Sequence, residues 1–186
     1  MMKLEDCRFD GSGTFKIENY PTNAKADKAR KEEYQRLTEE NTAKMAELQD
    51  KLYADGVEGV VIMLQAMDAA GKDSTIKHVM SGVNPQGVSV YSFKQPSKEE
   101  LAHDYLWRAV KNLPQRGQIA LFNRSYYEDV LVVRVHDLKS GYAMPARTVN
   151  MPEEQFFEKR FAQITNFEDY LYENGILDYV GELAGE

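Results

Sequence analysis

The sequence has very little cysteine and no long hydrophobic run. Cys7 is the single cysteine, so the chain cannot form an internal disulfide, and a lone thiol is typical of a reducing compartment. The chain has no run of 18 or more apolar residues, as an ordinary membrane-spanning helix would require, and its first residues lack the apolar stretch of a secretory signal. Hydrophobic residues still make up 42% of the 186 residues, enough for a folded core. We therefore expect a soluble, cytoplasmic protein without a membrane partner.

A broad basic excess is also absent. Lys and Arg total 23 against 30 Asp and Glu, which gives a formal net charge of -7. Proteins that bind nucleic acids usually carry a basic surface, so we expect no DNA or RNA partner. Residues 60–140 nevertheless hold 10 basic against 8 acidic residues. This local surplus is consistent with a focused site for a small or threaded anion. The alternative is that the surplus arose by chance, and composition alone does not decide between the two.

The hydrophobic pattern predicts helices alternating with strands. Three short apolar runs, rich in β-branched residues, predict buried strands at 59–65, 88–93 and 118–122. Helices are expected over about 27–53, ended by Asp55-Gly56, then over about 73–80, from Ser97 to about 113, from Ser125 to about 135, and from Pro152 to about 173. This alternation is typical of a doubly wound α/β domain, in which helices cover a parallel sheet.

The segment after the first expected strand has the form of a phosphate-binding loop. Residues 66–75 read AMDAAGKDST and lead from the strand into a helix. Small residues let backbone N–H groups close around phosphate oxygens, and Lys72 can reach the charge that develops on transfer. Ala66 and Asp73 depart from the usual Gly-x-x-x-x-Gly-Lys-Ser/Thr pattern, and Asp68 can offset the second departure by holding magnesium. The alternative is an ordinary strand-to-helix turn with an exposed lysine.

A second polar segment follows the third expected strand. Arg124 can clamp phosphate oxygens through two parallel hydrogen bonds, and Glu128 and Asp129 can orient a metal or an attacking phosphate. Because ligands bind at the carboxyl ends of parallel strands, we expect this segment to lie beside the first loop. The alternative is a solvated helix start without a chemical role.

Four segments together resemble the polyphosphate kinase 2 family. They read MDAAGKD at 67–73, HVMSGVNPQG at 78–87, YSFK at 91–94 and FNRSYYEDVLVVRVH at 122–136, and the resemblance covers about residues 25–175. It implies a three-layer α/β/α P-loop kinase-like fold with a parallel sheet. It also implies phosphoryl transfer between inorganic polyphosphate and nucleotides (AMP, ADP, ATP) with Mg²⁺. The Asn-Arg-Ser-x-x-Glu form implies the branch that phosphorylates nucleoside mono- and diphosphates.

The resemblance also implies roles for single residues. Asp68 would organise Mg²⁺, Lys72 would hold the transferring phosphate, and Arg124 would bind nucleotide or acceptor phosphates. Asn123 would share the catalytic site, because it stands at the acidic Walker B position, and Glu128 would help select the acceptor. Further substrate-binding positions would be Ala69, Ala70, Gly71, Asp73, Asn84 and Arg134. His136 would line the site, and Lys77, Lys94, Arg108, Lys111 and Arg116 would guide the polyanion, although each is as readily a plain surface charge.

The resemblance ends near Ile176, and the family pattern continues with another buried strand and an arginine-bearing lid. We therefore expect residues 1–56 to form a leader and a long amphipathic helix. Residues 57–186 would form a C-terminally truncated P-loop kinase core without the lid and last strands. With three strands, part of an apolar stripe would be uncovered and would favour a homo-oligomer. The residues of this stripe are Phe156, Phe157, Phe161, Ile164, Phe167 and Leu171.

Three functions remain open from the sequence. The first is a polyphosphate-dependent nucleotide kinase. The second is an inactive remnant that binds nucleotide or polyphosphate, since losing a lid arginine is costly in phosphoryl-transfer enzymes. The third is an ATP-dependent small-molecule kinase, because a phosphate loop alone does not name its phosphate donor.

Overall fold

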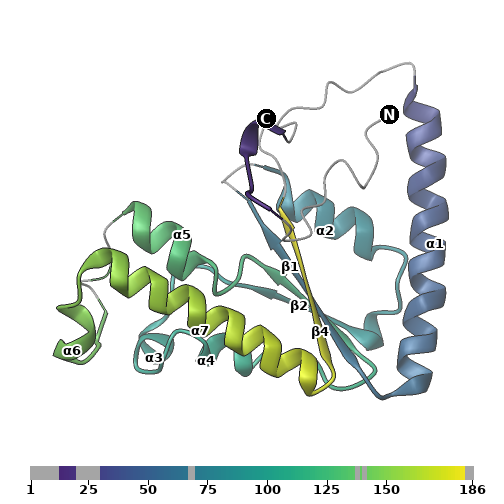
Figure 1. Ribbon diagram of the computed structural model, residues 1–186. Coiled ribbons are helices and arrows are strands. Elements are labelled where there is room, and N and C mark those ends of the chain that lie inside the picture. Colours follow the sequence, from purple (N-terminus) through teal and green to yellow (C-terminus); the bar gives the residue numbers. More distant parts are fainter. Residues whose placement is uncertain (1–12, 20–29, 67–69, 137–138, 140–141, 183–186) are drawn as a thin grey trace.

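A parallel four-stranded sheet forms the centre of the protein (Figure 1). The computed structural model describes residues 13–19, 30–66, 70–136, 139 and 142–182. The strands are β1 (Gly59–Gln65), β2 (Val88–Ser92), β3 (Ile119–Asn123) and β4 (Ile176–Glu182). Their order in the sheet is β2-β3-β1-β4, and every neighbouring pair is parallel. The α/β fold with a parallel sheet expected from the sequence is confirmed.

Helices cover both faces of the sheet. They are α1 (Lys31–Asp55), α2 (Lys72–Met80), α3 (Lys98–Leu101), α4 (Trp107–Val110), α5 (Glu128–Val135), α6 (Ala146–Val149) and α7 (Glu153–Glu173). In Figure 1, α1 and α2 lie on one side of the sheet, and α3, α4, α5 and α7 lie on the other. The right-handedness of parallel crossovers explains this division, because the chain moves one way across the sheet after β1 and the opposite way after β2. None of the helices in the described part of the chain is long and apolar enough to cross a membrane.

The main core lies between the sheet and the α5–α7 layer. Alternate residues of the two central strands point to this face, as the two-residue period of a strand requires. Val61 and Met63 of β1 pack there with Phe122 of β3, and all three are almost fully buried. Other members of the cluster are Phe93, Ala109, Ala120, Tyr126, Val130, Val133, Phe156, Phe157 and Ile164.

The fourth strand corrects the expectation of a sheet with only three. β4 pairs with β1 along its whole length, from Ile176 opposite Gly59 to Glu182 opposite Gln65. Asp178 and Gly181 interrupt its apolar run, so the sequence pattern is weak, and the strand is specified by pairing with β1. The stripe on α7 is correspondingly covered: Phe156, Phe157, Ile164 and Leu171 are buried and Phe167 is partly buried, whereas Phe161 stays exposed.

The segment after β2 also differs from expectation. A continuous helix was expected from Ser97 to about residue 113, but the structure has the two short helices α3 and α4. The start is as predicted, because Ser97 caps α3 and forms a reciprocal capping box with Glu100. The interruption has a local cause: the Asp104 carboxylate accepts a hydrogen bond from the Leu106 N–H at 3.0 Å and so begins a new turn.

The ends of α1 and α7 agree with the sequence pattern, and the start of α5 does not. α1 ends at Asp55 and is capped by Gly56, whose φ of 62° is left-handed and therefore favours glycine. α7 covers Glu153–Glu173 and is followed by Asn174-Gly175, as predicted. α5 begins at Glu128 rather than at Ser125, because Ser125 forms a turn in which its Oγ accepts a hydrogen bond from the Tyr127 N–H at 3.2 Å.

A buried glutamine ties α1 to the connection between α2 and β2. Gln49 is 3% exposed, its Nε2 donates to the Asn84 carbonyl at 2.7 Å, and its Oε1 accepts from the Asn84 N–H at 2.8 Å. Gly87 permits this approach, since a Cβ there would lie 2.6 Å from Gln49 Nε2. The Asn84 N–H thus has a protein partner, and the Asn84 carbonyl accepts from Gln49 and from the Gly87 N–H, the latter at 3.1 Å.

We predict that Gln49→Ala lowers the free energy of unfolding by about 2 kcal/mol, because the Asn84 N–H loses its partner and the Asn84 carbonyl keeps only the bond from the Gly87 N–H. Urea denaturation measures this change. Gln35→Ala is the matched control, since Gln35 lies exposed on the same helix. Equal effects of the two substitutions would contradict the assignment of the Gln49 contact as a structural tie.

Candidate functional site

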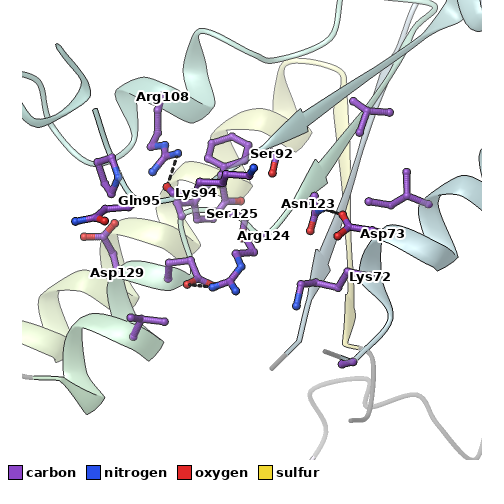
Figure 2. Close-up of a pocket in the computed structure, with 18 of the residues that line it drawn as sticks. Lys72, Asp73, Ser92, Lys94, Gln95, Arg108, Asn123, Arg124, Ser125 and Asp129 are labelled. Carbon is purple, nitrogen blue, oxygen red and sulfur yellow. Dashed lines mark hydrogen bonds and ion pairs between the residues drawn. The ribbon is translucent and has the colours of Figure 1, made fainter. Parts of the chain in front are cut away.

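The strand order defines one crevice at the carboxyl edge of the sheet. The connection after β1 runs over one face of the sheet through α2, and the connection after β3 runs over the other face through α5 and α7, so the two connections separate between these adjacent strands. Parallel sheets bind their ligands at such a point. A pocket of about 1000 Å³ lies there, lined by the turn after β1, the residues after β2 and the turn after β3 (Figure 2).

The turn after β1 supplies one wall of the pocket. Gly71 has a φ of 81°, a conformation that suits glycine, and it turns the chain into α2. Lys72 is only 8% exposed, and its ammonium donates to the Ala66 carbonyl at 2.8 Å. Ala70, Gly71, Lys72 and Asp73 all line the pocket, whereas Asp68 and Ala69 lie outside the described residues.

The turn after β3 supplies the facing wall. The Arg124 N–H donates to the Leu64 carbonyl of β1 at 2.9 Å, which fixes the start of the turn against the neighbouring strand. In Figure 2 the Arg124 side chain points into the pocket between Lys72 and Asp129. Lys72 and Arg124, which we expected at the same edge of the sheet, thus line one pocket.

A carboxylate bridges the tips of β1 and β3. Glu128 Oε2 accepts a hydrogen bond from Arg124 Nη1 at 3.1 Å, and Glu128 Oε1 accepts one from Gln65 Nε2. Gln65 is not among the site residues expected from the sequence, although its place at the carboxyl end of a strand is a usable signal. The two bonds hold the Arg124 guanidinium at the rim of the pocket and leave the orientation of Glu128 little freedom.

Asp129 is a buried carboxyl group at the other end of the pocket (Figure 2). Burial raises the pKa of Asp129, while a hydrogen bond from Tyr142 and the charges of Arg160 and Arg108 act in the opposite direction. Burial likewise raises the pKa of Tyr142. Asp129 Oδ1 has no hydrogen-bond partner among the described residues. Asp129 and Arg108 are expected from the sequence, whereas Tyr142 and Arg160 are not, because they lie further along the chain and no local pattern marks their contact with Asp129.

Oxygen ligands suited to a magnesium ion lie at the end of the pocket that is formed by the start of α2 and the tip of β3. Asp73 Oδ1 accepts a hydrogen bond from Asn123 Nδ2 at 2.6 Å, so a carboxylate and a side-chain amide stand side by side. Within the described ranges no group of three or more His, Cys, Asp and Glu residues could hold a metal. Magnesium is commonly bound by one or two carboxylates together with water and substrate phosphates, and the Asp73–Asn123 pair fits that pattern.

Several residues expected at the site do not line this pocket. The Asn84 side chain accepts a hydrogen bond from the Gln86 N–H, and the Arg134 guanidinium lies over the ring of Phe157. The remaining residues of this kind are His136, Lys77, Lys111 and Arg116. Two of these have other contacts: Lys111 lies over the Trp107 ring and Arg116 donates to the carbonyls of Val57 and Asn174. Lys94 and Arg108 do line the pocket.

The fold and the site define the class of protein. The strand order β2-β3-β1-β4, a Gly-Lys turn between β1 and α2, and an arginine at the tip of the adjacent strand make a P-loop kinase-like α/β domain. Within this class, the family model for Polyphosphate kinase 2 (PPK2) matches residues 28–180. The chain belongs to this family, and the match extends into β4, beyond the end of the resemblance seen in the sequence.

Curated relatives carry related names. The chain is 44% identical over 177 residues to an ADP-polyphosphate phosphotransferase of Rhodopseudomonas palustris, covering 94% of this chain and 61% of that protein. It is 46% identical over 132 residues to an AMP/ADP-polyphosphate phosphotransferase of Meiothermus ruber, covering 71% of this chain and 45% of that protein. The chain thus spans about half to three fifths of the length of these relatives.

A solved structure supports the fold. The crystal structure of polyphosphate kinase 2 from Arthrobacter aurescens TC1 superimposes with a TM-score of 0.78 at 34% sequence identity. The match covers 97% of this chain and 60% of that chain. Nearly all of the present chain therefore has a counterpart in a known member of the family.

We predict that Asp129→Asn changes the pH dependence of stability. Because the folded protein raises the pKa of Asp129, its stabilising contribution is present below the unfolded pKa of about 3.9 and is lost as the pH rises through the folded value. The free energy of unfolding of the unsubstituted protein should therefore fall, relative to that of Asp129→Asn, between acidic and neutral pH. Urea denaturation at a series of pH values measures this difference.

Asp50→Asn is the control for this series, since Asp50 lies exposed on α1. It should follow the stability of the unsubstituted protein at every pH. A constant offset between Asp129→Asn and the unsubstituted protein across the range would disprove the raised pKa.

Proposed function

We propose that this chain transfers a phosphoryl group between inorganic polyphosphate and nucleoside mono- or diphosphates such as AMP and ADP. The observation that carries the proposal is the convergence of Lys72 and Arg124 on one pocket at the carboxyl edge of the sheet. The family membership and the names of the relatives support the same substrates.

The chemistry needs positioning and charge neutralisation more than covalent participation by the protein. In the transfer, a P–O bond to the bridging oxygen of the donor breaks and a P–O bond to an acceptor phosphate oxygen forms. Lys72 would bind oxygens of the transferring group, and Arg124, fixed by Glu128, would bind the acceptor phosphates from the opposite wall. Ala70 and Gly71 would bring main-chain N–H groups close to the phosphates, with Ala69 beside them in the sequence.

Magnesium is part of the proposal. When bound, magnesium would supply positive charge that offsets the negative charge of the phosphates. Asp73 and Asn123 are the described residues that would hold it, and Asp68 is a further proposed ligand. Lys94 and Arg108 would attract a polyanion toward the far end of the pocket.

We predict that Lys72→Ala lowers turnover of ADP with magnesium and polyphosphate by about 100-fold or more, because one preorganised charge on the transferring group is lost. The assay follows ATP formation by purified protein. Lys77→Ala is the matched control, since Lys77 is an exposed lysine on the same helix, away from the pocket. Its turnover should stay within about twofold of that of the unsubstituted protein.

Three outcomes would count against the proposal. Equal turnover in Lys72→Ala and Lys77→Ala would remove Lys72 from the site. Binding of polyphosphate without turnover in the unsubstituted protein would favour a binding role. Activity with ATP as the donor and none with polyphosphate would favour an ATP-dependent small-molecule kinase.

A further inference from the structure

The pocket depends on one residue with an unusual backbone. Arg124 has a φ of 63°, and it is the only residue other than glycine with a positive φ in the described part of the chain. A left-handed conformation costs a residue with a side chain roughly 1–2 kcal/mol. Such a conformation persists only where the surrounding structure holds it in place.

Two hydrogen bonds hold the start of this turn, and two more hold the residues that follow it. The Arg124 N–H is bonded to Leu64, and the Phe93 N–H donates to the Asn123 carbonyl at 2.9 Å, so the chain is fixed up to Arg124. Beyond Ser125, the anchor comes from the side chains of Tyr126 and Tyr127. The hydroxyls of both reach Glu168 of α7, and Tyr126 also lines the pocket.

Glu168 on α7 receives both tyrosine hydroxyls on a single oxygen atom. Its Oε1 accepts from Tyr127 Oη at 2.6 Å and from Tyr126 Oη at 2.9 Å. Tyr126 is further fixed by burial and by edge contact with the ring of Phe167, at 5.7 Å between ring centroids. Hydrogen bonds to a carboxylate are stronger than bonds between neutral groups.

The surroundings of Glu168 disfavour its charged form. Burial raises the pKa of Glu168, as do the like charges of Asp178 on β4 and Asp169 on α7, and the two hydroxyl bonds act in the opposite direction. Burial and contact with Glu168 in turn raise the pKa of both tyrosines. The tyrosines therefore remain neutral hydrogen-bond donors at physiological pH. Their two hydrogen bonds replace those that water would make to the Glu168 carboxylate.

We propose that Glu168 is a positioning residue for the pocket, although it does not line it. Through Tyr126 and Tyr127 it fixes the turn after β3, and so holds Arg124 in the left-handed conformation in which its guanidinium faces Lys72 across the pocket. The link to phosphate binding rests on the proposed function, whereas the link from Glu168 to the conformation of Arg124 does not.

The test compares Glu168→Ala with Glu168→Gln. Alanine removes the acceptor of both hydroxyls, whereas the glutamine carbonyl oxygen can still accept them. One readout is the ¹H–¹⁵N NMR signals of the Arg124 backbone amide and side-chain Nε–H, the latter assigned by its loss in Arg124→Lys. The second is the affinity for tripolyphosphate, measured by titration calorimetry. The third is thermal unfolding, which reports general loss of stability.

We expect Glu168→Ala to shift both Arg124 signals and to weaken tripolyphosphate binding on the order of tenfold, since a displaced charge loses its fit to the anion. Glu168→Gln should keep the signals and the affinity close to those of the unsubstituted protein. Tyr127→Phe should reproduce part of the loss, and it should add little when Glu168 is already alanine. Glu158→Ala, an exposed glutamate on the same helix, is the matched control and should change neither readout.

Unchanged Arg124 signals in Glu168→Ala would overturn the inference, as would an equal loss in Glu168→Gln, which would assign the effect to charge alone. If Glu168→Ala does not fold, Tyr126→Phe and Tyr127→Phe decide the question, because each deletes one hydroxyl and keeps the ring. If the unsubstituted protein does not bind tripolyphosphate, the proposed function fails, and the NMR comparison still decides the role of Glu168.

Discussion

The parallel pairing of β1 with β3 is the constraint on which the site depends. Residues 60–64 lie beside residues 119–123, so the turns that follow the two strands start at the same edge of the sheet. Lys72 and Arg124, far apart in the sequence, therefore line one pocket. The Arg124 N–H bond to Leu64 and the Glu128 bond to Gln65 continue this pairing beyond the last residues of β3.

The parts of the fold that could be predicted from the sequence are those with a strong local pattern. β1 is a continuous apolar run and α7 has helical spacing with clear ends, and both were placed closely. β4 was missed because its pattern is short and interrupted, and its partner strand specifies it. The break between α3 and α4 depends on one hydrogen bond of Asp104, which competes with the helix in a way that hydrophobic spacing does not reveal.

The same distinction applies to the site. Arg124 directly follows β3, and Lys72 follows the turn after β1, so the parallel topology places them at the same edge of the sheet. Asn84 and Arg134 belong to motifs of the family, yet in the structure one caps a short turn and the other packs against an aromatic ring. Tyr142 and Arg160 reach Asp129 from distant parts of the chain, and no local pattern marks such a contact.

The left-handed backbone of Arg124 has a consequence for the evolution of the chain. Glycine is the residue best suited to this backbone, so an arginine here lowers folding stability while it supplies the charge that the proposed phosphate site needs. A selection for heat resistance alone would favour losing the arginine, whereas a selection for growth that requires activity would keep it. Such trade-offs are common where a strained residue serves a ligand.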